Sequence, residues 1–338
     1  MPKPAPPPPP PPVAGHAAWE DYAIPGIDVR LRRFLGPRRS GVPAINPVYQ
    51  FREALVREIA WAVWPHDDGD WSPSLLCGPK SSGKTTLVEQ IAAHCNIPVF
   101  RTNMNVGTTV RHLKGRRGAR QGGTYFVPGI AVTAMEEGAW LLLDEISGAT
   151  PPVALSLFPI LEPGGEVHLE EAEPPRYVER HPDFRIFATD NTIGAEQEDT
   201  RFSYGGTNPE VNEALLDRFL STVQVGYMEP MQEFTAIKAT VPGIPAQELE
   251  GMIRVARAVR DADDIEHAFG MRMLIAWARR VASGTLTADG TVIPFSATGD
   301  DSYLLEQAGP AFLDRIRSRA ERDSICEVIR RVFAIETK

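Results

Sequence analysis

The sequence predicts an α/β fold in which a parallel sheet lies between helices, followed by a smaller helical domain. Two observations carry this expectation. Short apolar strands alternate with helical segments between residues 74 and 225, which is typical of a parallel sheet covered on both faces. From Pro230 onward the strand patterns stop and helical periodicity takes over.

The composition sets limits on the function. The chain has 338 residues with 35 basic and 44 acidic side chains, so 35 − 44 gives a net charge of −9. This acidic balance argues against a general electrostatic grip on nucleic acid, although it leaves room for a local basic channel. The longest apolar runs, such as residues 139–143, are far shorter than the roughly 20 residues that span a bilayer, so we expect no membrane segment. Three widely spaced cysteines predict neither a disulfide framework nor a zinc site, which fits a reducing cytoplasm.

The first twelve residues are dominated by proline, with an unbroken run from Pro6 to Pro12. Proline fixes φ and lacks an amide donor, so we expect polyproline II or disorder here and a folded chain from near Trp19. Two interpretations stay open: a ligand for a proline-binding module, or a solvated spacer.

The expected elements of the α/β part follow in chain order. A four-residue spacing of apolar side chains predicts a helix over residues 50–64, and a polar loop follows at 67–70. We expect an exposed, mobile loop over the Gly- and Arg-rich residues 115–129 and a hairpin within 166–182. The expected strands are 74–77, 99–102, 139–143, 185–189 and 222–225, and the further helices are 86–94, 130–137, 151–161 and 209–220. In the helical part we expect helices at 246–262, 270–282 and 311–334.

A phosphate-binding loop follows the first of the sheet strands. Its pattern, G-x-x-x-x-G-K-[ST], lets a curled backbone turn its N–H groups toward phosphates. Lys84 would reach the β and γ oxygens, and Thr85 would offer its hydroxyl to Mg²⁺ at the positive end of the next helix. The expected nucleotide-binding residues are Gly78, Pro79, Lys80, Ser81, Ser82, Gly83, Lys84, Thr85 and Thr86.

Two carboxylates end the apolar strand about 60 residues downstream of that loop. Asp144 is the expected second Mg²⁺ ligand, mostly through water. Glu145 would orient and polarise the attacking water.

The order of four motifs resembles the AAA+ ATPases. After the phosphate loop and the Asp-Glu pair, a polar pair ends the strand Phe187-Ala188-Thr189-Asp190-Asn191, and an arginine ends the segment Leu215-Leu216-Asp217-Arg218-Phe219. The resemblance implies a P-loop AAA+ core with a helical lid, ATP as the nucleotide, and assembly into a ring, with six subunits as the expected number. It also implies that Asn191 is sensor 1, that Arg218 is an arginine finger acting on a neighbouring subunit, and that Arg272 is the sensor 2 arginine.

Within that family the sequence is similar to the MoxR branch, and most to CobS-like ATPase subunits of cobaltochelatase. The residues that carry this similarity are Phe187-Ala188-Thr189-Asp190-Asn191-Thr192-Ile193-Gly194, Tyr204-Gly205-Gly206-Thr207, Leu216-Asp217-Arg218-Phe219, Leu161-Glu162 and His181-Pro182-Asp183-Phe184-Arg185. The resemblance implies a client with a von Willebrand-type domain, or a chelatase-like metalloenzyme complex.

A basic cluster interrupts the acidic chain at Lys114, Arg116, Arg117 and Arg120. It is either a solvated loop or a substrate-facing loop that grips an acidic segment or a nucleic-acid backbone. The second reading keeps an alternative function open, that of an AAA+ nucleic-acid translocase or restriction-type motor.

From these patterns together we expect a proline-rich tail at 1–18, an N-terminal extension at 19–45, an ATPase domain at 46–228 and a helical lid at 229–338.

Overall fold

The computed structural model describes residues 19–63, 71–120, 123–191, 209–262, 264–265, 269–286, 292–293 and 302–335. The described residues group into two compact units. The first contains residues 19–46, 51–78 and 83–225, and the second contains residues 226–335 together with the short segments 47–50 and 79–82. The proline-rich tail, the loop at 67–70 and the motif residues 192–207 lie outside the described residues.

A five-stranded parallel sheet forms the centre of the first unit, in the order β11-β3-β10-β7-β4. The strands are β3 (Ser74–Cys77), β4 (Val99–Asn103), β7 (Trp140–Asp144), β10 (Arg185–Asp190) and β11 (Ser221–Gln224). Every residue of β3, β7 and β10 is buried, as expected for strands covered on both faces. The predicted parallel α/β fold is confirmed.

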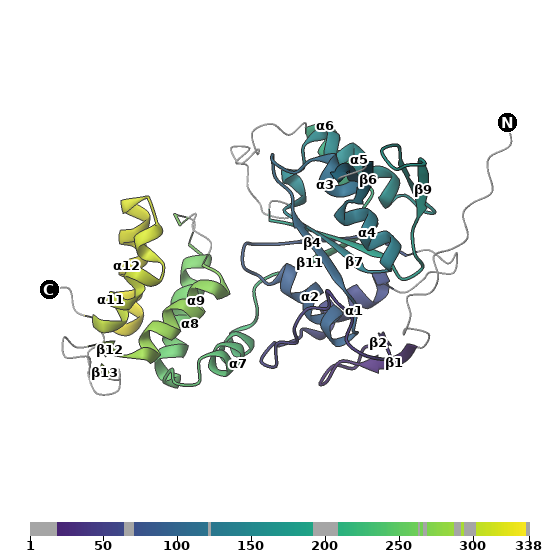
Figure 1. Cartoon of the computed structure of the whole chain (residues 1–338). Coiled ribbons are helices and arrows are strands. Elements are labelled where there is room, and N and C mark those ends of the chain that lie inside the picture. Colours follow the sequence, from purple (N-terminus) through teal and green to yellow (C-terminus); the bar gives the residue numbers. More distant parts are fainter. Residues whose placement is uncertain are drawn as a thin grey trace. The chain divides into compact units, whose positions relative to one another are not determined.

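Helices cover both faces of this sheet (Figure 1). On one face α1 (Glu53–Val63) and α2 (Lys84–His94) pack with Leu76 and Leu142. On the other, α4 (Ile130–Glu137) and α5 (Pro151–Leu161) pack with Leu141 and Leu143. Neighbouring residues of one strand thus enter opposite cores because strand side chains alternate between the two faces.

Shorter elements complete the first unit. They are β1 (Trp19–Ala23), β2 (Arg30–Phe34), α3 (Val110–Lys114), β5 (Gly115–Arg120), β6 (Gly123–Pro128), η1 (Ile146–Gly148), β8 (Glu166–Leu169), β9 (Arg176–Glu179) and α6 (Pro209–Leu216). β8 and β9 pair as the hairpin predicted within 166–182. Helix α6 ends at Leu216 and is therefore shorter than the helix expected over 209–220.

The prediction of a mobile loop at 115–129 is wrong, because β5 and β6 form an antiparallel hairpin there. Glycine and arginine gave this stretch a loop-like composition. The β-forming residues Tyr125, Phe126 and Val127 pair opposite them, and Phe126 packs against the core beside α4 and α5. Pairing between strands and packing against the core thus override the local composition.

The second unit is mainly helical. It contains α7 (Pro230–Thr240), α8 (Ala246–Arg260), α9 (Met271–Ser283), β12 (Thr285–Leu286), β13 (Val292–Ile293), α11 (Ser302–Ala311), η3 (Leu313–Arg315) and α12 (Arg319–Phe333). The single helix predicted over 311–334 is wrong. A new helix begins after Ser318, whose side chain accepts a hydrogen bond from the Glu321 backbone N–H. The buried Leu313 and Ile316 lie before that cap, and their spacing made the sequence look like one continuous helix.

No helix in the described part of the chain combines the length and the apolar character that crossing a membrane requires.

Candidate nucleotide-binding site

The loop from Gly78 to Thr85 leads from β3 into α2. Gly78 has φ 141°, and a Cβ atom there would lie 2.3 Å from the carbonyl oxygen of Val225. Gly83 has φ 94° immediately before the helix. A side chain is excluded at the first position by close approach and disfavoured at the second by the left-handed backbone. These two glycines therefore let the chain turn tightly, as a phosphate-binding loop requires.

The four residues between these glycines, Pro79 to Ser82, group with the second unit. Within that unit the Tyr227 hydroxyl donates to the Lys80 carbonyl oxygen at 3.4 Å. Ser81 has φ 62°, in the left-handed region that few residues other than glycine adopt. The centre of the loop is thus held in a conformation that its own sequence does not favour.

Lys84 begins α2 and lies almost wholly buried. Its Nζ donates to the carbonyl oxygen of Gly78 at 2.8 Å and to Oδ1 of Asn191 at 2.7 Å. Burial lowers the pKa of Lys84 to about 8, although nearby groups, Asp190 first among them, oppose that shift. The predicted phosphate-binding lysine and the predicted sensor 1 residue therefore lie side by side.

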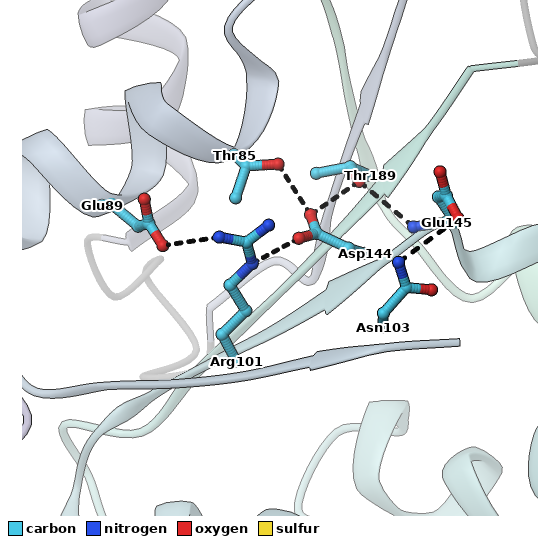
Figure 2. Close-up of polar contacts among 7 residues, drawn as sticks. All are labelled: Thr85, Glu89, Arg101, Asn103, Asp144, Glu145 and Thr189. Carbon is cyan, nitrogen blue, oxygen red and sulfur yellow. Dashed lines mark hydrogen bonds and ion pairs between the residues drawn. The ribbon is translucent and has the colours of Figure 1, made fainter. Parts of the chain in front are cut away.

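Asp144 lies at the carboxyl end of β7 and receives three donors (Figure 2). Its Oδ1 accepts from the hydroxyls of Thr85 at 2.7 Å and Thr189 at 2.9 Å, and its Oδ2 accepts from Nε of Arg101 at 2.5 Å. Carboxylate and hydroxyl oxygens are ligands that Mg²⁺ prefers. Thr85 and Asp144, the predicted metal ligands, thus form a donor set that fits this ion.

Glu145 follows Asp144 with φ 55°, and this turn leads the chain out of the strand. Its backbone N–H donates to Oγ1 of Thr189 at 3.3 Å, and its carboxylate accepts from the Asn103 amide at 3.3 Å (Figure 2). The buried hydroxyl of Thr189 therefore contacts both Asp144, through its carboxylate, and Glu145, through its backbone N–H.

Arg218, the predicted arginine finger, has a different set of partners. Its guanidinium lies 3.7 Å from the ring centroid of Phe158, donates to the Ala214 carbonyl oxygen at 2.6 Å, and pairs with Glu162 at 3.5 Å. These three partners come from the end of α5 and from α6, not from the phosphate loop. Arg272, the predicted sensor 2 residue, is exposed in the first turn of α9 in the second unit.

Sequence reasoning missed several members of this site. Arg101 and Asn103 come from β4, and Arg101 also pairs with Glu89 at 3.2 Å. Burial would lower the pKa of Arg101, but the carboxylates of Asp144 and Glu89 outweigh that effect and raise it. The two residues stand two apart at the carboxyl end of a predicted strand, so alternation could have placed both side chains on one face of the sheet.

Asp190 is a further member whose role the sequence did not indicate. It is buried at the end of β10, and its Oδ2 accepts from both the backbone N–H and the hydroxyl of Ser147 in η1. This contact ties the turn after Glu145 to the strand that carries Asn191. The carboxyl ends of β7 and β10 are thereby fixed to one another.

The sequence is similar to a domain family and to several known proteins. Residues 73–219 match the AAA domain family of the dynein-related subfamily. The chain is similar to the aerobic cobaltochelatase subunit CobS of a Sinorhizobium species, with 28% identity over 308 residues, 88% of this chain and 84% of that protein. It is also similar to midasin of Dictyostelium discoideum, with 25% identity over 263 residues, 77% of this chain but only 4% of midasin.

Among solved structures, a mutant form of RuvB from Thermotoga maritima is similar, with a TM-score of 0.48 and 16% identity over 75% of this chain and 68% of that one. The family match spans the phosphate loop, Asp144, Glu145, Asn191 and Arg218. Residues 73–219 therefore carry an AAA domain of the dynein-related subfamily, and the chain is similar over most of its length to the cobaltochelatase subunit CobS.

Proposed function

We propose that this protein is a ring-forming ATPase that hydrolyses ATP to remodel a partner protein or a metalloenzyme complex. The observation that carries the proposal is the convergence of separate motifs at one edge of the sheet. Lys84 contacts Asn191, and Thr85 contacts Asp144, although 107 residues separate the first pair in sequence and 59 separate the second.

The phosphate loop would hold the nucleotide. Its backbone N–H groups would face the phosphates, and the Lys84 ammonium would reach the β and γ oxygens. Thr85 and Asp144 would hold Mg²⁺, which when bound neutralises phosphate charge. The Arg101 guanidinium also forms an ion pair with Asp144, so this carboxylate has a positively charged partner within the protein itself.

The catalytic roles are divided among three side chains. Glu145 would accept a proton from the attacking water, and Asn191 would help to position that water. Arg218 would stabilise the developing negative charge on the γ-phosphoryl group of a neighbouring subunit. Such an arrangement requires a homo-oligomer, and we propose a hexameric ring.

The two units would divide the work. We propose residues 46–228 as the ATPase domain and residues 229–338 as a lid in which Arg272 senses the bound nucleotide. Residues 1–18 and 19–45 would be a tail and an extension. The three cysteines are free thiols, which supports a reducing compartment such as the cytoplasm.

The identity of the client is the most specific part of the proposal. The similarity to CobS over most of both chains supports a chelatase-like complex or a partner with a von Willebrand-type domain. A second candidate is a nucleic-acid translocase, which the basic residues Lys114, Arg116 and Arg117 favour. The net charge of −9 counts against it.

Stimulation of ATP turnover distinguishes these functions. The full-length protein is assayed alone, with a purified protein that carries a von Willebrand-type domain, and with single- and double-stranded DNA and RNA. We expect stimulation by the protein partner and none by nucleic acid. Stimulation by nucleic acid alone would overturn the remodelling proposal in favour of the translocase.

A further inference from the structure

A pocket of about 750 Å³ opens beside the β5–β6 hairpin, and none of its lining residues belongs to the phosphate loop. Three elements contribute to it: α3, the β5–β6 hairpin, and the turn between β8 and β9. The side chains that give it its chemistry are Arg111, Arg116, Arg117, Tyr125, Val127 and Glu171. A volume of this size is typical of ligand sites in proteins.

Glu171 joins the two hairpins that form this pocket. Its carboxylate accepts the backbone N–H of Arg117 at 3.0 Å, and its carbonyl oxygen accepts from Nε of the same arginine at 3.0 Å. The guanidinium of Arg111 lies 3.8 Å from the carboxylate. The pocket wall is therefore held by specific bonds between segments that lie 54 residues apart.

The pocket keeps an excess of positive charge. Three arginines face one glutamate in its wall. The Arg116 side chain is exposed and makes no hydrogen bond or ion pair with another residue in the described part of the chain. In a protein with a net charge of −9, this local excess selects an anionic ligand.

An aromatic surface lies next to this positive charge. Tyr125 pairs with Gly118 across the hairpin, and a Cβ atom on that glycine would lie 2.9 Å from Cζ of the tyrosine. The ring therefore lies over the glycine, and half of the Tyr125 side chain is exposed. Val127 pairs with Arg116 in the same way. Side chains of a ligand can thus make apolar contacts beside the guanidinium group.

We propose that this pocket binds a carboxylate-rich peptide segment of a partner protein. Arginine guanidinium groups form paired hydrogen bonds with carboxylates, and a peptide also supplies apolar groups for Tyr125 and Val127. A nucleic-acid duplex fits less well, because it would bring one charge per about 1.7 Å of its axis against a wall that contains the Glu171 carboxylate. The inference concerns binding alone and does not depend on the proposed ring or on ATP hydrolysis.

The test uses the full-length protein without nucleotide and a fluorescein-labelled octaglutamate peptide. Fluorescence anisotropy gives its affinity, with an octaglutamine peptide and a thymidine octanucleotide as comparison ligands. The informative variant is Arg116→Glu, and its matched control is Arg254→Glu, which makes the same charge change at an exposed position on α8. Both variants are first checked for an unchanged thermal unfolding midpoint.

We expect octaglutamate to bind the wild-type protein and Arg254→Glu alike. Arg116→Glu should bind it at least about tenfold more weakly, because a charge-assisted hydrogen bond is replaced by repulsion between like charges. Octaglutamine should not bind. Gly118→Ala should also weaken octaglutamate binding, because it displaces the Tyr125 ring without changing charge.

Equal loss of affinity in Arg116→Glu and Arg254→Glu would overturn the proposal, since it would show that overall charge governs binding. Tighter binding of the oligonucleotide than of octaglutamate, dependent on Arg116, would replace the peptide with nucleic acid. ATP turnover of Arg116→Glu without a partner should equal that of the wild type. The pocket and the ATPase proposal can therefore fail separately.

Discussion

The carboxyl ends of β3, β7 and β10 and the β5–β6 pocket organise charge in opposite ways. At the strand ends the Lys84 ammonium and the Asp144 carboxylate are buried and hydrogen-bonded within the protein: Asp144 is only 4% exposed and accepts from three donors. In the pocket the arginines are exposed, and the Arg116 side chain has no bonded partner among the described residues. The strand ends satisfy their buried charges internally, whereas the pocket leaves the charge of Arg116 to solvent or to a ligand.

This difference separates two functional demands. A hydrolytic site needs side chains held in fixed positions before the substrate arrives, because misplacement of a reacting group by about 1 Å can cost about 100-fold in rate. A docking site for a partner needs unsatisfied charge on the surface, which attracts and selects the ligand. Substitutions at the strand ends should therefore reduce turnover, whereas substitutions in the pocket should alter binding.

The largest effect should come from Glu145→Gln. The amide keeps the size of the carboxylate but cannot accept a proton, so we expect turnover to fall by about 1,000-fold while ATP affinity stays close to that of the wild type. Phosphate release and binding of a fluorescent ATP analogue measure the two quantities. Glu179→Gln, at an exposed position on β9, is the control. Unchanged turnover in Glu145→Gln would refute the catalytic role of this residue.

A smaller effect should come from Thr189→Val, which keeps the shape of a buried side chain but removes its hydroxyl. Asp144 then loses a donor and the Glu145 amide loses its acceptor. We expect the free energy of unfolding to fall by about 1–3 kcal/mol and turnover to fall by about tenfold.

Chemical denaturation and phosphate release measure the two consequences of Thr189→Val. The control is Thr222→Val on the exposed face of β11, which should change neither quantity. If both variants behaved alike, the buried network around Asp144 would contribute nothing, and the contrast between the two regions would be lost.

The smallest effect should come from Glu171→Gln in the pocket, and it should have the opposite sign. Removing the only negative charge of the lining should raise the affinity for octaglutamate about threefold, because like charges repel. The stability should change by less than about 0.5 kcal/mol, since the glutamate is partly exposed. Glu170→Gln, at a neighbouring exposed position, is the control. A loss of affinity would show that Glu171 acts by holding the hairpins together.

Much of the sheet could be predicted because its strands are short, rich in apolar residues and bounded by clear signals. The strand Ser74–Cys77 and the helices Ile130–Glu137 and Pro151–Leu161 have the bounds expected from the sequence. The phosphate loop was recognisable because its chemistry depends on adjacent residues. Local patterns of this kind are what a sequence displays directly.

The other contacts depend on pairing between distant segments. Arg101 reaches Asp144 because β4 lies next to β7 in the sheet, and the sequence of neither strand indicates which strands are neighbours. The β5–β6 hairpin was missed because its glycines and arginines are typical of a loop, while its pairing and the packing of Phe126 stabilise strands. The pocket needs Glu171 from a second hairpin, so neither sequence segment indicates it alone.

The claim that two neighbouring subunits build one hydrolytic site is tested most directly by mixing two inactive variants. Arg218→Ala keeps Glu145 but lacks the finger, and Glu145→Gln keeps Arg218 but lacks the group that acts on water. Each alone should bind ATP and hydrolyse it at least about 100-fold more slowly than the wild type. In the mixed oligomer, Glu145 of one variant meets Arg218 of the other, so we predict that turnover recovers well above the sum of the separate rates. A mixture no more active than its two components would contradict the account.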